Sequence, residues 1–416
     1  MKKQYTTLFL VILGIQLQAQ VAKTVNQGDL SISSGTQVST YFDFENQSTG
    51  NVFNDGEMHF FGDYDNKGLF SYSTNQATGY VVFEALHGNA QKISGNAPSF
   101  FYDALYRNTS GFEMSNATTY AGTVNLYDGV VVMDKAAGGS FIFLKGATHT
   151  NTSDRSHVEG EVTKEGNEAF TYPIGDGGFY RMAGISAPIS ASDSYTGEYV
   201  LSNTDAQYPH SSKTGVIDRI DDQEHWLIEK TSNSPDNVLV TLSWDERTTP
   251  DYLLGNNIDR LHVVRWDKAQ QLWVDEGGVV DVASKTVTTL TKVEDFGVYT
   301  LATIKPPVLH PGDVVIYDGV TPDGDGMNDY FIIDNIWLYP QNTVRIYNRW
   351  GREVYHTESY NSSGNVFTGI AQGKGIVSQG EALPTGTYYY VVEYFYTRDG
   401  INQWVKKVGY LHLETE

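Results

Sequence analysis

The chain of 416 residues carries 50 acidic and 28 basic side chains, a formal net charge of −22, and has no cysteine. The lack of cysteine excludes disulfides, thiolate catalysis and cysteine-ligated zinc or iron–sulfur centres. The negative charge disfavours nucleic acid as a partner, and the length suffices for two or three domains of about 100–200 residues each.

The N-terminus has the pattern of a secretory signal peptide. Two lysines and an apolar run over residues 8–15 are followed by a small-residue site that ends at Ala19. We therefore expect residues 1–19 to be a signal peptide, cleaved between Ala19 and Gln20. The apolar run is well short of the roughly 20 residues that a membrane helix needs, and no later segment is long and apolar enough to span a bilayer.

Beyond residue 20 the sequence predicts β structure almost everywhere. Tyr, Phe, Val, Ile and Thr occur in short runs bounded by Gly, Asn, Asp and Ser, and no long stretch keeps an apolar period of 3.6 residues. Aromatic and β-branched side chains suit a pleated, half-buried surface, and Gly and Asn form the tight turns between short strands. We predict an all-β protein.

Residues 20–155 favour a β-solenoid. Closely spaced turns rich in Asn and Gly, such as Asn54-Asp55-Gly56 and Asn66-Lys67-Gly68, separate short strands. Such a rhythm is typical of a parallel β-helix or a similar solenoid, in which each coil buries its inward side chains against its neighbours. The repeat shows no fixed period, so an irregular β-sandwich is the alternative.

Residues 156–305 contain longer alternating strands, at 238–242 and 261–266, and predict a β-sandwich. The prolines at 306, 307 and 311 then mark a stiff linker over residues 306–312, since consecutive prolines lack N–H donors for a sheet.

An acidic cluster within the middle region includes Asp218, Asp221, Asp222 and Glu224. Paired carboxylates serve as acid and nucleophile in glycoside hydrolysis, but nothing in the sequence fixes the separation of these groups. We interpret the cluster as a short solvated linker before the strand at Trp226, because chance clusters are common in so acidic a chain.

Four segments of residues 313–416 carry a specific pattern of turns and strands: residues 321–329, 344–351, 383–391 and 408–413. The turn residues predict a compact antiparallel sandwich of about seven strands. Asn348 to Gly351 predicts a hairpin corner with a buried tryptophan at its centre, and the tyrosines from Tyr388 onward should pack by alternation on one face. The motif residues are Thr321, Pro322, Asp323, Gly324, Asp325, Gly326, Asn328, Asp329, Asn348, Arg349, Trp350, Gly351, Leu383, Pro384, Gly386, Thr387 and Tyr388.

In order, spacing and position, these segments resemble the gliding-motility-associated C-terminal domain, the type B sorting domain of the type IX secretion system of Bacteroidota. The resemblance implies an Ig-like antiparallel β-sandwich over residues 313–416. It also implies contact with the type IX machinery at the outer membrane, export across that membrane, and a final place at the cell surface or in the medium. Two departures from the family are an enlarged loop over residues 368–382 and Phe367 where a tryptophan is expected.

The acidic loop of the first segment is a candidate calcium site. Asp323, Asp325, Asn328 and Asp329 crowd hard oxygen donors around two glycines, as Ca²⁺ prefers. The loop is not an EF-hand, because its glycine falls too early and a closing glutamate is missing. A turn stabilised by its own Asx side chains is the interpretation that we favour, so no cofactor is required.

No enzyme motif is present: the ten histidines include no His-Glu-x-x-His pair, and the chain has no Gly-x-Ser-x-Gly elbow and no phosphate-binding loop. We expect a non-enzymatic surface protein that serves adhesion, gliding motility or envelope assembly by binding an unidentified surface protein or glycan. The alternative is a secreted polysaccharide-degrading enzyme of β-helix type. That enzyme requires three carboxylates and an Arg or Lys that converge on the solenoid face.

Overall fold

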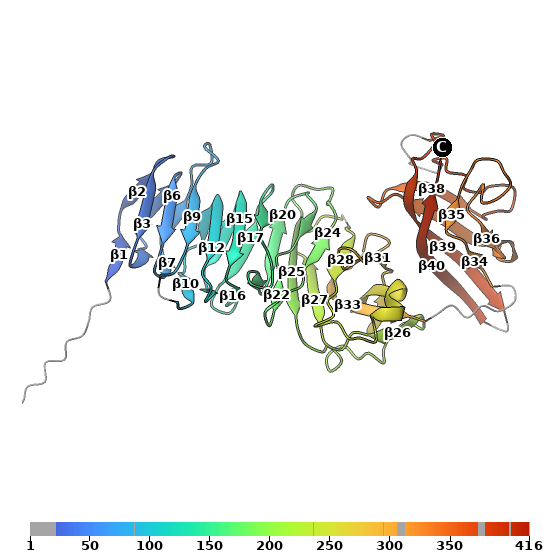
Figure 1. The fold of residues 1–416 in the computed structure, drawn as a ribbon, viewed down its shortest axis with the longest axis horizontal. Helices are drawn as coiled ribbons and strands as arrows, with labels where there is room; N and C mark the ends of the chain where they lie inside the picture. The colour runs from blue at the N-terminus through green and yellow to red at the C-terminus, as the bar shows by residue number, and fades with distance from the viewer. Residues whose placement is uncertain are drawn as a thin grey trace, which may run out of the picture.

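The computed structural model describes residues 22–86, 88–235, 237–293, 295–305, 313–372, 379–398 and 401–415. The predicted signal peptide, its cleavage site at Ala19 and Gln20, and the predicted linker 306–312 lie outside the described residues. The remaining chain is nearly all β, as predicted (Figure 1). No helix in the described ranges is long and apolar enough to cross a membrane.

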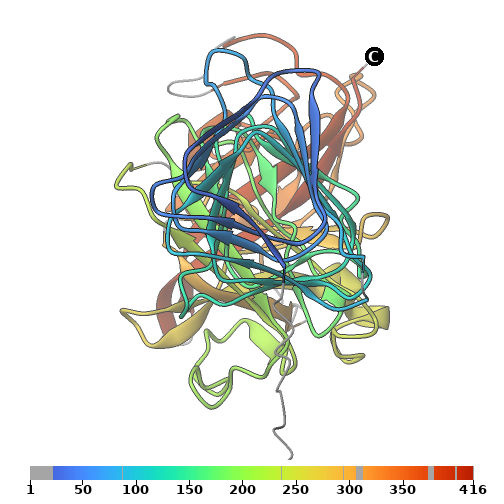
Figure 2. The same ribbon diagram turned by 90° about the vertical axis from the view of Figure 1, so that its left-hand side faces the viewer.

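Residues 23–165 form a stack of coils around one core, seen end-on in Figure 2. Parallel strands of successive coils pair in register and build the three faces of this solenoid in the described part of the chain. The strands of the first face are β1 (Lys23–Asn26), β4 (Asp43–Asn46), β7 (Tyr64–Asn66), β10 (Gln91–Ser94), β13 (Phe112–Met114), β16 (Val131–Met133) and β19 (Val158–Glu159). Those of the second face are β2 (Asp29–Ile32), β5 (Asn51–Asn54), β8 (Leu69–Ser71), β11 (Ser99–Phe101), β14 (Ala117–Tyr120), β17 (Ser140–Phe143) and β20 (Val162–Glu165). Those of the third face are β3 (Gln37–Thr40), β6 (Glu57–Phe60), β9 (Tyr80–Phe83), β12 (Asp103–Arg107), β15 (Thr123–Asp128) and β18 (Thr148–Thr150).

The solenoid prediction is confirmed, and the structure also explains why no fixed period was visible. Strands of the first face begin at residues 23, 43, 64, 91, 112, 131 and 158, so the coil length varies between 19 and 27 residues. The longer coils carry extra residues in the loops between faces, whereas the strands themselves stay in register.

A column of aromatic rings fills the centre of the solenoid. Phe60 lies 5.3 Å from Phe83, Phe83 lies 5.3 Å from Tyr106, and Tyr120 lies 4.5 Å from Phe141, measured between ring centroids. All five rings are buried. Each such pair contributes about 0.5–1.5 kcal/mol beyond the area that it buries, so the column ties successive coils together.

Asparagines line the corner between the first two faces. Asn26 donates to Asn46 Oδ1 over 2.9 Å, and Asn46 donates to Asn66 Oδ1 over 2.8 Å. Asn46 and Asn66 are completely buried, and their amides also donate to the backbone carbonyls of Leu69 and Ala97. The ladder therefore satisfies polar groups that would otherwise be costly to bury.

The second face of the solenoid continues into the middle region without a break. Strand β20 pairs in antiparallel fashion with β25 (Ser194–Val200), and this sheet extends through β27 (His225–Lys230) to β33 (Gly297–Ile304). Buried side chains from Ile32 to Leu301 form one continuous hydrophobic cluster. The other members of the extended sheet are β26 (Ile217–Ile220), β29 (Leu261–Asp267) and β30 (Leu272–Asp275).

A second sheet packs on that core and makes the middle region a sandwich. Its strands are β21 (Phe170–Thr171), β24 (Ala183–Ile185), β28 (Val240–Ser243), β31 (Val279–Asp281) and β32 (Thr286–Thr288). A short hairpin of β22 (Gly175–Asp176) with β23 (Phe179–Tyr180) contacts β25, and the 3₁₀ turn η1 (Gly255–Arg260) contacts β33.

The interpretation of the acidic cluster as a solvated linker is wrong for two of its members. Asp221 and Glu224 are 1% exposed, because the turn before β27 is covered by side chains of the sandwich, and Tyr199 and Thr249 donate hydrogen bonds to Glu224. Glu224 there forms an ion pair with the equally buried Arg181.

The C-terminal region has its own hydrophobic cluster, separate from that of the rest of the chain. One sheet has the strand order β35-β40-β39-β37-β38, and β34 and β36 form a separate two-stranded sheet that packs on the same core. The bounds are β34 (Val315–Ile316), β35 (Gly319–Val320), β36 (Ile333–Asp334), η2 (Ile336–Leu338), β37 (Asn342–Tyr347), β38 (Glu353–Glu358), β39 (Gly386–Arg398) and β40 (Ile401–Leu413).

Two details of the C-terminal prediction are wrong. The sheet is not purely antiparallel, since β35 pairs with β40 in parallel. Trp350 is 69% exposed rather than buried, because it stands at the tip of the β37–β38 hairpin. The predicted alternation of tyrosines is confirmed, since Tyr388 and Tyr394 point into the core.

Candidate functional site

The acidic loop of the C-terminal region is closed by its own side chains. Asp329 accepts from the N–H groups of Gly324 (2.7 Å) and Gly326 (2.9 Å), and Asp325 accepts from Met327 N–H (2.7 Å). Both glycines adopt φ near +80 to +90°, a region that side chains disfavour. The loop is thus the Asx-stabilised turn that the sequence favoured.

The same loop brings three carboxylates close together. Oxygens of Asp323, Asp325 and Asp329 lie within 4.8 Å of one another, which is near enough to share a cation. The backbone carbonyl of Asn328, the fourth predicted ligand, accepts from Thr321 N–H over 2.8 Å. Calcium binding by this loop stays a prediction.

The second motif segment forms the predicted hairpin corner. Asn348 Oδ1 accepts from the N–H groups of Trp350 and Arg352, each over 3.1 Å, and Gly351 has a φ of +72°. The Arg349 guanidinium lies 4.5 Å from the Trp350 ring centroid. A Cβ on Gly351 would lie 3.2 Å from Leu239 Cδ1, so this corner adjoins the middle region.

The third segment lies beside the terminal strand. Tyr388 donates its hydroxyl to the Pro384 carbonyl over 2.8 Å and buries its ring, while Leu383 N–H donates to Gly369 O over 2.8 Å. Gly386 and Thr387 begin β39 and pair with Leu413 and His412 of β40. The structure thereby places the first, third and terminal segments together and the Asn348–Gly351 corner elsewhere.

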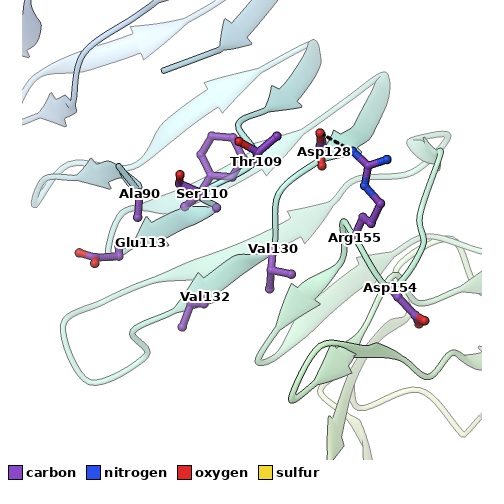
Figure 3. A pocket seen from close by; sticks show the side chains of 11 residues that line it. Ala90, Thr109, Ser110, Glu113, Asp128, Val130, Val132, Asp154 and Arg155 are labelled. Carbon is purple, nitrogen blue, oxygen red and sulfur yellow. Dashed lines mark hydrogen bonds and ion pairs between the residues drawn. The ribbon is translucent and has the colours of Figure 1, made fainter. Parts of the chain in front are cut away.

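A second candidate site is a groove on the first face of the solenoid, shown in Figure 3. It has a volume of about 530 Å³ and crosses β13 and β16. Val130 and Val132 form an apolar floor, and the hydroxyls of Thr109 and Ser110 lie at the rim. Sequence reasoning missed this site, because neighbouring coils of a solenoid bring together residues that are about 20 positions apart.

Three of the four charged groups that line the groove are already engaged with one another or with the sandwich. Arg155 donates to Asp128 over 2.7 Å. Asp154 accepts from Arg247 over 2.6 Å and from Tyr180 N–H over 2.9 Å. Burial alone would raise the pKa of Asp154, but these two donors hold it below its usual value. Glu113 points away from Asp154, at the opposite end of the groove (Figure 3).

Comparison with known proteins identifies the C-terminal region. Residues 314–413 match the CHU_C type IX secretion signal domain family. No curated protein and no solved structure matches the chain. The predicted sorting domain is therefore confirmed, and such a signal indicates export across the outer membrane to the cell surface or the extracellular space.

Proposed function

We propose that this chain, whose C-terminal domain is a type IX secretion signal domain, is a non-enzymatic surface protein that binds a polysaccharide in the groove of its solenoid. Binding of this kind serves adhesion, gliding motility or assembly of the cell envelope.

The observation that carries the proposal is the chemistry of the groove. An apolar floor with hydroxyls at the rim suits the apolar faces and hydroxyl edges of a sugar chain. Val132 lies on β16, and the other three side chains lie in the turns directly before β13 and β16. Because paired strands over a continuous aromatic core anchor these turns, little ordering entropy is lost when a ligand binds.

The arrangement of carboxylates favours binding over catalysis. A lyase or hydrolase needs free carboxylates that converge on the reacting bond. In this groove Asp128 is bonded to Arg155, and Asp154 is bonded to Arg247. The Glu113 side chain is 61% exposed, 3.7 Å from Lys92, and distant from both in Figure 3.

Two outward-facing valines of the same sheet provide a matched test. Val132 lies in the groove and is 47% exposed, whereas Val25 lies on the first coil and is 44% exposed. We expect Val132→Glu to abolish retention of the purified protein on immobilised envelope polysaccharide, and Val25→Glu to leave it unchanged. Equal retention of both variants would contradict the assignment of the groove.

Incubation with the same polysaccharide tests the absence of catalysis. We expect no increase in reducing or unsaturated chain ends with time. Release of such ends by the wild type, lost in Asp128→Asn, would establish the enzyme alternative instead.

A further inference from the structure

Two motif segments of the signal domain and the residues that follow its terminal strand, separated by up to about 90 residues of sequence, line one cleft. The cleft has a volume of about 710 Å³. Thr321, Pro322 and Asp323 contribute from the first segment, Thr385 from the third, and Glu414 from the residues that follow the terminal strand. The hairpin corner at Asn348–Gly351 does not line it.

Hydrogen bonds within the domain fix the shape of this cleft. Thr385 Oγ1 donates to Thr415 O over 2.7 Å and accepts from Thr415 N–H over 2.9 Å, and Glu414 N–H donates to Val320 O over 2.9 Å. These bonds join Glu414 and Thr415 to the third segment and to the residue directly before the first segment. The walls are therefore set by the domain's own fold and need no partner to form.

A glycine makes the close approach of the walls possible. Gly369 has a φ of +77°, and a Cβ there would lie 3.0 Å from Leu413 and 3.6 Å from Pro322. Gly369 thus sits between the first segment and the terminal strand, where a side chain would be strained and crowded. The enlarged loop that begins at Thr368 starts from this point.

We propose that this cleft is the surface through which the secretion machinery recognises the domain, and that its occupant is a basic, extended polypeptide segment of that machinery. The lining offers hydroxyls and the carboxylates of Asp323 and Glu414, and no lysine or arginine is among the described residues that line the cleft. Such a surface supplies acceptors and negative charge, so a partner rich in N–H donors and positive charge is complementary to it. The inference rests on residues 314–413 acting as the secretion signal.

Two variants perturb the cleft in different ways. Ala382 lines it and is exposed, so Ala382→Trp fills the space without disturbing a core. Glu414→Lys reverses the charge at the wall. Glu358 is equally exposed at the end of β38, on the opposite edge of the sheet, so Glu358→Lys is the matched charge control.

The full-length variants are expressed in a bacterium with a type IX system, and the surface and periplasmic fractions are quantified. We expect both cleft variants to reduce the surface fraction by about tenfold, which corresponds to about 1.4 kcal/mol of recognition free energy. The protein should accumulate in the periplasm, and the melting temperatures of the purified proteins should be unchanged. Glu358→Lys should behave as wild type.

Wild-type surface amounts for both cleft variants would overturn the assignment of the cleft. If Ala382→Trp reduces the surface fraction and Glu414→Lys does not, the partner is not basic. If a chain without residues 313–416 reaches the surface in wild-type amounts, the signal function itself fails, which is a different result from failure of the cleft.

Discussion

The Arg181 guanidinium donates a hydrogen bond of 2.7 Å to the Glu224 carboxylate in the interior of the sandwich. Both side chains are 1% exposed or less. Arg181 also donates to the Ser243 carbonyl of β28, and Glu224 accepts from the Tyr199 hydroxyl of β25, so the pair joins the two sheets.

Breaking this ion pair from one side should be costly. Arg181→Leu leaves a buried, uncompensated carboxylate, and we expect it to lower the free energy of unfolding by about 3–5 kcal/mol. The double variant Arg181→Leu/Glu224→Leu should lose less free energy of unfolding than Arg181→Leu alone, because neither charge remains. Urea titration measures both. The exposed pair of Arg247 with Asp154 is the control, and Arg247→Leu should cost about 1 kcal/mol or less.

The neighbouring Asp221 should make stability depend on pH. Burial, and then the negative charge of Glu224, raise the pKa of Asp221 well above its ordinary value. The folded protein therefore keeps a proton on Asp221 that the unfolded chain releases, and its contribution to stability falls as the pH rises above the ordinary carboxyl pKa. The neutral variant Asp221→Asn lacks this pH-dependent contribution to stability. Its free energy of unfolding relative to wild type should increase between about pH 4 and pH 7, and a constant difference would contradict the prediction.

Interrupting the hydrogen-bonded row of Asn26, Asn46 and Asn66 should destabilise the solenoid. Asn46→Ala removes the donor to the Leu69 carbonyl and to Asn66 Oδ1, a fully buried acceptor. We expect a loss of about 1–3 kcal/mol in urea unfolding. Asn51, whose bond to Asp29 is at the surface, is the control, and Asn51→Ala should change stability by no more than about 0.5 kcal/mol.

Burial separates two aromatic residues of the signal domain. Phe367 is completely buried against Tyr355, with ring centroids 5.1 Å apart, whereas Trp350 is 69% exposed. Phe367→Ala should cost about 3–5 kcal/mol and reduce surface delivery through misfolding. Trp350→Ala should stay within about 0.5 kcal/mol of wild type in thermal unfolding. A large loss of stability in the Trp350 variant would show that the corner is packed in solution.

The acidic loop can be tested with a single substitution. Asp329→Ala removes the acceptor for two loop N–H groups, so we expect a lower melting temperature both in EDTA and in calcium. If calcium raises the melting temperature of wild type but not of the variant, the loop is a calcium site and not only a turn.

The sequence by itself determined the strand-rich character of the chain and the identity of its C-terminal domain. Both can be seen along the sequence itself: the first in β-branched and aromatic runs between Gly and Asn turns, the second in the order, spacing and position of four motif segments. Asp329 and the loop glycines illustrate this, since the turn they form is closed within six residues.

Only the tertiary structure decided which of those residues act together. Asp221 and Glu224 were predicted to be solvated but are buried, because their burial depends on the strands that cover them. Trp350 was predicted to be buried but is exposed, because its exposure depends on the direction of a hairpin tip. The groove at Val132 and the cleft at Gly369 consist of residues from different coils or segments. Such surfaces arise from pairing between strands distant in sequence, and that pairing leaves no periodic trace when coil length varies.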